Sequence, residues 1–234
     1  MALGADVVRS LFYYGETRNS RVHELVAIAE AKGIGATAVD IPRLDELTAD
    51  GVHQGVLVRL RPLPLRTLDD IPEDGPSLAI LLDHITDPQN LGAVVRTSVA
   101  VGVDAIVLPA RRGVLLTPGV HRASAGLSFL APMVAPQNLA QAISALKQRG
   151  FWVVAAEAGE GSQPATAFDW PQRTALILGS EGEGIGQLLL RESDFKVALP
   201  MDPRVDSLNV GVACGALAYL WRRQWPGAPL PLTD

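Results

Sequence analysis

One stretch of this chain combines residue types that can do chemistry, Asp87-Pro88-Gln89-Asn90-Leu91-Gly92-Ala93-Val94-Val95-Arg96-Thr97. From Ala93 to Val101 the only charge is Arg96, and a helix that is apolar almost all round is normally buried. The small residues Gly92, Ala93 and Ala100 lie one helical turn from Arg96 and leave room for a close neighbour. We therefore expect a buried guanidinium that binds an acidic side chain or an anionic ligand, because an unpaired buried charge is too costly to keep.

A second candidate loop is Gly179–Gly186, which holds four glycines and the carboxylates Glu181 and Glu183. Glycines permit positive φ angles and a close backbone approach to a ligand. The glycine spacing matches neither of the common phosphate-binding motifs, and the two carboxylates would repel a pyrophosphate. We expect the loop to bind a neutral or cationic ligand through backbone groups; a glycine-rich turn with solvated Glu side chains is the alternative.

The third candidate loop, Leu199–Asn209, begins where Pro200 ends a strand. Asp206 or Ser207 can cap the helix that follows, and the glycines early in that helix indicate tight packing against another backbone. For Ser207 and Asn209, capping and first-turn positions are the alternative to a functional role. In the first candidate loop, which leads from the strand 78–82 to Asn90, Asn90 is likewise expected to cap a helix, with Pro88 shaping the turn before it.

A fourth segment, His121-Arg122-Ala123-Ser124-Ala125-Gly126, combines cations with small residues. It is expected to be a loop, which either contacts RNA or phosphate or is a solvated surface loop. His121 has no nucleophile or carboxylate at motif spacing, so we do not interpret it as catalytic.

The elements that must position these loops follow from the apolar pattern. After residue 77, strands alternate with helices, which predicts an α/β fold with a parallel sheet covered on both faces. Ligands bind such sheets beyond the carboxyl ends of the strands, where the three candidate loops lie. The expected strands are 78–82, 105–108, 151–155, 175–178 and 196–199, and the expected helices are 91–101, 139–149, 186–192 and 207–223.

The N-terminal part is a smaller α/β unit. Its expected strands are 7–14, 36–41 and 55–60, and its expected helices are 20–32 and 41–47. Proline and acidic residues mark 63–76 as a linker. The predicted organisation is a small domain over 1–62, this linker, a large domain over 77–225 and a disordered tail over 226–234.

Composition narrows the class of protein. The chain has 234 residues, 48% hydrophobic and 19% charged, which is typical of a globular protein without a membrane span. Its start lacks the pattern of a secretion signal, and Cys214 alone cannot form an intrachain disulfide. The four His residues lack metal-ligand spacing, so we expect no metal, no membrane partner and a cytoplasmic location.

The formal net charge of −5 by itself argues against a nucleic-acid partner. However, residues 1–66 carry eight basic and eight acidic side chains, and 17 of the 20 cations are Arg. Arg suits bidentate phosphate binding, although a coding bias explains the same count.

The loops together resemble the SpoU family of RNA 2′-O-ribose methyltransferases, within the SPOUT superfamily. The motifs are 87–97, Leu178-Gly179-Ser180-Glu181-Gly182-Glu183-Gly184, and Leu199-Pro200-Met201 with Ser207-Leu208-Asn209-Val210, and the run 121–126 also matches. The resemblance covers about residues 78–222. It departs at Pro203, where the family usually has Gly, and at Gly211, where Ser is frequent. Residues 7–60 look like the family's L30e-like substrate-recognition domain, shortened at its start.

The resemblance implies a deep trefoil knot in the large domain, an obligate homodimer, S-adenosylmethionine as cofactor and an RNA substrate, with ribosomal RNA of the large subunit favoured over tRNA. The residues that carry over to catalysis are Asn90, Arg96, Glu181, Ser207 and Asn209. Those expected to bind the cofactor are Leu178, Gly179, Gly182, Leu199, Met201, Ser207 and Leu208. Those expected to contact RNA are Arg96, Arg122 and Ser124.

In the resulting hypothesis Arg96 binds the target phosphate and stabilises the developing alkoxide, because a guanidinium is a poor base. A proton-accepting role for Arg96 stays open. Two other classes remain as alternatives: a nicotinamide-dependent oxidoreductase, and a non-catalytic RNA-binding protein of the same fold. A cofactor-dependent absorbance change tests for the oxidoreductase, and a methylation assay separates the methyltransferase from the non-catalytic protein.

Overall fold

The computed structural model describes residues 7–49, 51–61, 63, 65–109 and 116–226, and the chain divides into two compact units between residues 64 and 65. The expected disordered tail lies, apart from Pro226, outside the described residues. Among the described helices, none has both the length and the apolar composition needed to cross a membrane.

The N-terminal unit is a three-stranded sheet with two helices. Strand β1 lies in the centre, parallel to β2 and antiparallel to β3. Its core is formed by Leu11, Val22, Ala29 and Leu44. The elements are β1 (Val8–Tyr14), α1 (Ser20–Ala31), β2 (Ala36–Val39), α2 (Ile41–Thr48) and β3 (Val56–Leu60). All five elements expected from the sequence are therefore present, with ends that differ by two residues at most.

The C-terminal unit is built on a seven-stranded sheet in the order β6-β5-β4-β9-β7-β10-β8, in which every strand pair is parallel. All six residues of the interior strand β4 are buried, as expected for a parallel sheet covered on both faces. The strands are β4 (Ser77–Leu82), β5 (Ala105–Val107), β6 (Met133–Val134), β7 (Trp152–Ala156), β8 (Gln163–Pro164), β9 (Arg173–Leu178) and β10 (Phe195–Ala198). The predicted parallel α/β sheet is confirmed, and the two-residue strands β6 and β8 were not expected.

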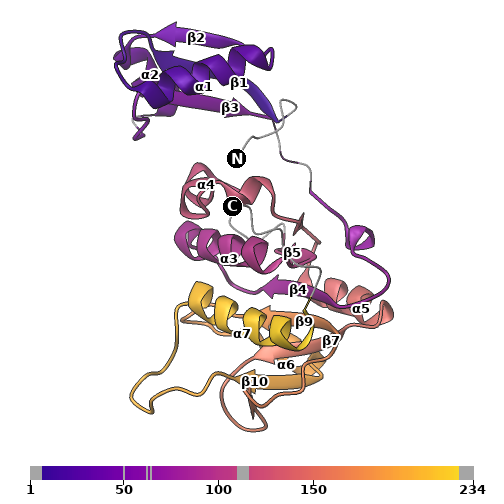
Figure 1. Cartoon of the computed structure of the whole chain (residues 1–234). Coiled ribbons are helices and arrows are strands. Elements are labelled where there is room, and N and C mark those ends of the chain that lie inside the picture. Colours follow the sequence, from indigo (N-terminus) through magenta and orange to yellow (C-terminus); the bar gives the residue numbers. More distant parts are fainter. Residues whose placement is uncertain (1–6, 50, 62, 64, 110–115, 227–234) are drawn as a thin grey trace. The chain divides into compact units, whose positions relative to one another are not determined.

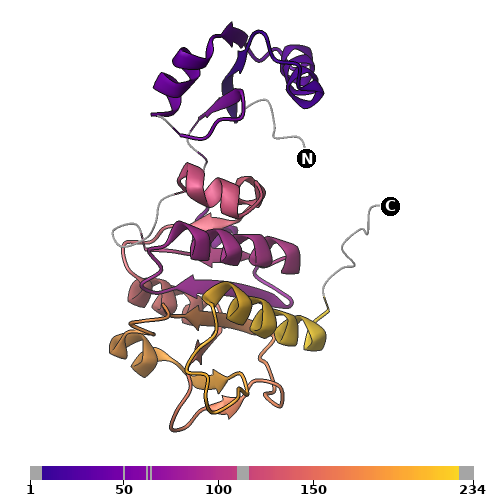
Figure 2. The same ribbon diagram turned by 90° about the vertical axis from the view of Figure 1, so that its left-hand side faces the viewer.

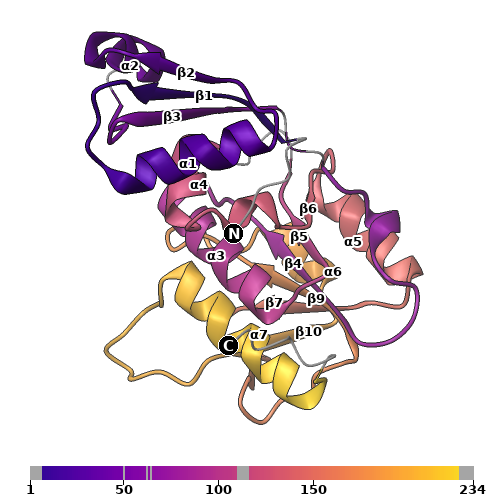
Figure 3. The ribbon, with the colours of Figure 1, turned by 45° about the horizontal axis from the view of Figure 1, so that its top comes forward.

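Helices cover both faces of this sheet (Figure 1, Figure 3). Helices α3 and α7 run along one face and share a buried apolar cluster with it, whereas α5 and α6 pack on a second cluster with the other face. The helices are α3 (Pro88–Val101), α4 (Pro118–Ala123), α5 (Leu139–Gln148), α6 (Gln187–Glu192) and α7 (Val210–Gln224), with 3₁₀ turns η1 (Leu68–Asp70) and η2 (Leu127–Phe129). Because α4 includes residues 118–123, the prediction of a loop at 121–126 was wrong for its first half.

The expected helix caps also need correction. Asp87 rather than Asn90 caps α3, because the Asp87 carboxylate accepts a hydrogen bond from the Asn90 N–H at 2.9 Å. Asn209 rather than Asp206 or Ser207 caps α7, since its side-chain oxygen accepts from the Gly211 N–H at 3.0 Å. Near each helix start the sequence holds more than one polar side chain that could cap it, Asp87 and Asn90 before α3 and Asp206, Ser207 and Asn209 before α7.

Part of the predicted linker is packed on the C-terminal unit. Ile71 is only 2% exposed and belongs to the apolar cluster beneath α5. The Arg149 guanidinium donates to the Ile71 carbonyl at 2.7 Å, and the Arg173 guanidinium donates to the Pro72 carbonyl at 2.9 Å. Residues around Ile71 are therefore held by the large unit, which the proline-rich composition did not indicate.

Small residues let α3 approach its two neighbouring helices, and Figure 2 shows α3 and α7 side by side. A Cβ at Gly92 of α3 would lie 2.3 Å from the Ala123 Cβ of α4, and a Cβ at Gly211 of α7 would lie 2.6 Å from the Ala93 Cβ. Such distances are far shorter than any van der Waals contact. The space that the small residues leave is thus filled by α4 and α7 rather than left for a ligand.

We predict that Gly92→Ala destabilises the protein by about 1–3 kcal/mol, because the added methyl group must push α3 and α4 apart. Chemical denaturation of the two proteins measures this difference. Gly182→Ala is the matched control, since a Cβ there meets nothing within 4 Å. Equal stabilities of Gly92→Ala and Gly182→Ala would contradict the close approach of the two helices.

Candidate active site

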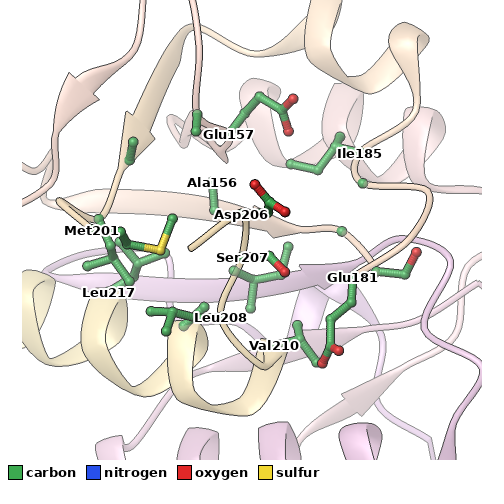
Figure 4. Close-up of a pocket in the computed structure, with 18 of the residues that line it drawn as sticks. Ala156, Glu157, Glu181, Ile185, Met201, Asp206, Ser207, Leu208, Val210 and Leu217 are labelled. Carbon is green, nitrogen blue, oxygen red and sulfur yellow. The ribbon is translucent and has the colours of Figure 1, made fainter. Parts of the chain in front are cut away.

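The second and third candidate loops come together at the carboxyl ends of β9, β7 and β10, where they enclose a pocket of about 400 Å³. Figure 4 shows side chains from both loops and from α7 lining it. The pocket lining contains every residue that the sequence predicted to bind a cofactor: Leu178, Gly179, Gly182, Leu199, Met201, Ser207 and Leu208. The rule that ligands sit beyond the carboxyl ends of parallel strands therefore located this pocket correctly.

The glycine-rich loop is folded tightly against itself. A Cβ at Gly179 would lie 2.2 Å from the Gly184 backbone, so only glycine fits there. Gly184, with a φ of 65°, donates its N–H to the Ser180 carbonyl at 3.0 Å. The far end is held by the Asp83 carboxylate, which accepts from the Gly186 N–H at 2.9 Å. The shape of the loop therefore depends on its glycines, and residues 179–185 of the loop line the pocket.

The pocket is acidic. Its described lining includes four carboxylates, Glu157, Glu181, Glu183 and Asp206, and no Lys, Arg or His side chain. Apolar residues such as Met201, Leu208 and Leu217 form the opposite part of the lining (Figure 4). This combination suits a ligand with an apolar or aromatic part and a positive charge, and it disfavours a pyrophosphate.

A polar cluster lies beside the pocket and joins three segments. The Asn209 amide donates to the Asn90 side-chain oxygen at 2.7 Å and to the Glu181 carboxylate at 3.0 Å. Asn90 comes from the first turn of α3, Glu181 from the glycine-rich loop and Asn209 from the start of α7. The structure therefore brings together three of the five residues that the sequence predicted to be catalytic, and Ser207 lies in the adjoining pocket lining.

Arg96 does not lie where its apolar neighbours suggested. Its side chain is exposed, and it has no hydrogen bond or ion pair among the described residues. Helix α3 packs its apolar residues inward, among them Val94 and Val95, and leaves one edge facing solvent. The expectation of a buried guanidinium was wrong because α3 is an outer layer of the unit. A free, exposed guanidinium is available to an anionic ligand.

The two other residues predicted to contact RNA differ in position. Arg122 is exposed on α4, so it can reach a ligand. Ser124 is fully buried, and its hydroxyl donates to the His121 carbonyl and accepts from the Ser128 N–H, both at 3.2 Å. Because these bonds hold the turn after α4, the prediction that Ser124 contacts RNA does not fit its burial.

Two titratable groups near these loops have shifted pKa values. In the third loop, the side-chain and backbone hydrogen bonds from Arg204 hold the pKa of Asp202 at about 2. Burial lowers the pKa of His121, whose ring is stacked on Phe129 with its centroid 4.5 Å away. Asp202 is therefore a stable anion that pairs with Arg204, and His121 favours its neutral form.

The sequence reasoning missed two acidic residues of the pocket. Glu157 directly follows β7, and Asp206 was interpreted only as a helix cap. The signal for Glu157 was its place after a parallel strand, the same signal that identified the other loops. The described residues hold no group of three or more His, Cys, Asp or Glu side chains that could bind a metal ion.

Comparison with known proteins agrees with this geometry. A family model described as the SpoU rRNA Methylase family matches residues 77–219, and a model for RNA 2′-O ribose methyltransferase substrate binding matches residues 2–65. The first match covers more than half of the chain and includes all three loops. The chain belongs to the SpoU methylase family.

Particular relatives resemble the chain over nearly its whole length. It is 37% identical to the 23S rRNA (guanosine-2′-O-)-methyltransferase RlmB of Pseudomonas syringae, over 91% of this chain and 86% of that protein. It is 35% identical to the putative TrmH family tRNA/rRNA methyltransferase YacO of Bacillus subtilis, over 90% of this chain and 86% of that protein. Among solved structures, an AdoMet-bound rRNA methyltransferase from Sinorhizobium meliloti superposes with a TM-score of 0.78 at 26% identity, over 94% of this chain and 81% of that one.

We predict that Asn209→Asp destabilises the protein by about 1 kcal/mol, because it replaces two donated hydrogen bonds by a carboxylate that faces Glu181. Thermal or chemical unfolding measures the change. The cap itself is kept, since Asp accepts from the Gly211 N–H as Asn does.

Asn138→Asp is the control, because Asn138 caps α5 by accepting from the Gln141 N–H at 2.9 Å. We expect its stability to stay within about 0.5 kcal/mol of the wild type. If both variants are equally stable, the amide of Asn209 does not hold the three segments together.

Proposed function

We propose that this protein transfers a methyl group from S-adenosylmethionine to a ribose 2′-OH in structured RNA, most favourably ribosomal RNA of the large subunit. The observation that carries the proposal is the pair of hydrogen bonds by which Asn209 contacts Asn90 and Glu181, next to an acidic, partly apolar pocket. Membership of the SpoU family and the names of the relatives support the same activity.

The pocket fits this cofactor. Backbone groups of Leu178 and Gly179 and the apolar side chains of Met201 and Leu208 suit an adenosine, which is flat and mostly apolar on its faces. The carboxylates suit a sulfonium cation. S-adenosylmethionine, when bound, supplies an electrophilic methyl group attached to that sulfonium.

The chain's own residues then orient the nucleophile. Asn90 and Asn209 present amide groups at the rim, where they can hold a ribose hydroxyl and its neighbours. Arg96 is free to bind an RNA phosphate and to stabilise the negative charge that develops on the 2′ oxygen as this oxygen takes the methyl group from the sulfonium and releases its proton to water. A guanidinium keeps its own proton, so Arg96 acts through its charge rather than as a base. Ser207 and Glu181 line the part of the pocket in which methyl transfer occurs.

We predict that Arg96→Ala lowers kcat/KM for RNA methylation by about 10²-fold or more while S-adenosylmethionine still binds. Arg96 is absent from the pocket lining, so calorimetry with the cofactor gives an unchanged dissociation constant. A tritiated-methyl assay measures transfer. Arg191→Ala, which removes an exposed Arg on α6, keeps wild-type activity as the control. Near-wild-type turnover by Arg96→Ala would contradict a role of Arg96 in methyl transfer.

The N-terminal unit is proposed to select the RNA. We infer that residues 1–62 form an L30e-like RNA-binding domain joined by residues 63–76 to a catalytic domain over 77–225. The match of residues 2–65 to a substrate-binding model supports this division. Exposed Arg122 on α4 extends the proposed RNA contact to the catalytic domain, and the proposed site of action is the cytoplasm.

The substrate is tested by comparing 2′-O-methyl sites in RNA from cells with and without the gene. Loss of one methylated guanosine in large-subunit ribosomal RNA is expected, because the RlmB relatives are named for that reaction. Loss of a tRNA site instead would make the protein a tRNA methyltransferase. An unchanged pattern, with no transfer in vitro, would leave a non-catalytic RNA-binding protein.

We further propose that the polypeptide around α7 forms the deep trefoil knot and the homodimer implied by the family resemblance. The order of strands and the packing of α7 on α3, next to the glycine-rich loop, support the knot. For the dimer, α7 carries apolar side chains that the core of the unit does not cover. Val212 is 57% exposed and Tyr219 is 56% exposed. Seven residues separate them, so they share one face of the helix.

We predict that Val212→Asp weakens self-association by about tenfold or more, because a charge would enter an apolar contact. Sedimentation at several concentrations measures the shift. Leu188→Asp is the control, since Leu188 is 52% exposed on α6 and lies outside the proposed interface. A wild-type protein that sediments as a monomer, or a dimer unaffected by Val212→Asp, would contradict this interface.

A further inference from the structure

His84 has a strained backbone at the carboxyl end of β4. Its φ is 57°, in the left-handed region that residues other than glycine seldom occupy. Such conformations persist where surrounding contacts hold them, and they cluster at functional sites. The proposed catalytic and cofactor-binding residues do not include His84, although it comes directly before the loop that leads to Asn90.

The His84 ring lies between two carboxylates from different segments. Its Nδ1 is 3.5 Å from the Asp83 Oδ2, and its Nε2 is 3.7 Å from the Glu183 Oε2. The Nδ1 atom is buried and has no hydrogen-bond partner among the described residues. Each ring nitrogen of His84 therefore faces one carboxylate oxygen, Nδ1 that of Asp83 and Nε2 that of Glu183.

These contacts place the ring against the glycine-rich loop. The Asp83 carboxylate that faces His84 also accepts from the Gly186 N–H, and a Cβ at Gly186 would lie 3.8 Å from the His84 Cε1. Glu183 belongs to the pocket lining, whereas His84 does not. The imidazole therefore supports the loop from outside the pocket.

We propose that His84 is a positioning residue whose imidazole holds Glu183 and the end of the glycine-rich loop in the shape that encloses the cofactor. The inference rests on the proposed function, because this loop is the proposed cofactor-binding loop. Loss of the imidazole weakens cofactor binding through Glu183. It leaves the transfer step itself nearly unchanged, since Asn209, not His84, contacts Asn90 and Glu181.

The test uses His84→Gly, which removes the ring and relaxes the backbone. Calorimetry is expected to show S-adenosylmethionine bound about two- to fivefold more weakly, the size of one partly exposed charged contact. Hydrogen exchange at residues 180–186 is expected to rise, and kcat at saturating cofactor is expected to stay within about twofold of wild type. His84→Asn, which tolerates a positive φ, replaces it if the glycine variant folds poorly.

Gln54→Gly is the matched control. Gln54 also has a positive φ, 49°, but belongs to the N-terminal unit, so this variant relaxes the same kind of strain away from the loop. Its cofactor affinity is expected to equal that of the wild type. An equal loss of affinity in both glycine variants would overturn the positioning role.

A double-mutant cycle with Glu183→Gln tests the route of the effect. If His84 acts through Glu183, then His84→Gly adds little to the affinity already lost in Glu183→Gln. Fully additive losses, or an unchanged dissociation constant in His84→Gly, would overturn the inference. Failure of the wild-type protein to bind S-adenosylmethionine would overturn the proposed function instead, so the two failures are distinguishable.

Discussion

The side chain of Asn209 joins three segments that are distant in the sequence. Its oxygen accepts from the Gly211 N–H and starts α7, while its amide donates to Asn90 and to Glu181. One planar group thus joins the start of α7 to the first turn of α3 and to the glycine-rich loop. Through this contact Asn209 lies within hydrogen-bond distance of both Asn90 and Glu181.

That contact depends on a second constraint, the close approach of the helices. Gly211 and Ala93 bring α7 against α3, and Gly92 and Ala123 bring α4 against the other side of α3. A larger residue at either glycine would separate the helices and with them the loops they carry. Close packing at small residues and the polar contacts of Asn209 are therefore two parts of one arrangement. Arg96 lies on the edge of α3 that neither α4 nor α7 covers.

The sheet and its loops were accessible to sequence reasoning because their signals are local. The buried strand before Asp83 and the apolar run before Gly179 are long enough to be recognised, and ligand loops follow the carboxyl ends of parallel strands. Hence all seven residues expected to bind a cofactor line the pocket. The caps were predicted less well, because Asp87 and Asn90, or Ser207 and Asn209, have equivalent side chains within one turn, and only the backbone path selects between them.

The sequence by itself determined the α/β alternation, the three loops and the polar residues they carry, since these depend on the periodicity of apolar residues and on the residue types that close a turn. Tertiary structure alone decided that Arg96 is exposed, that Ser124 is buried and that His84 lies between Asp83 and Glu183. Burial and partnership depend on which distant segment packs against a residue, and no local pattern contains that information.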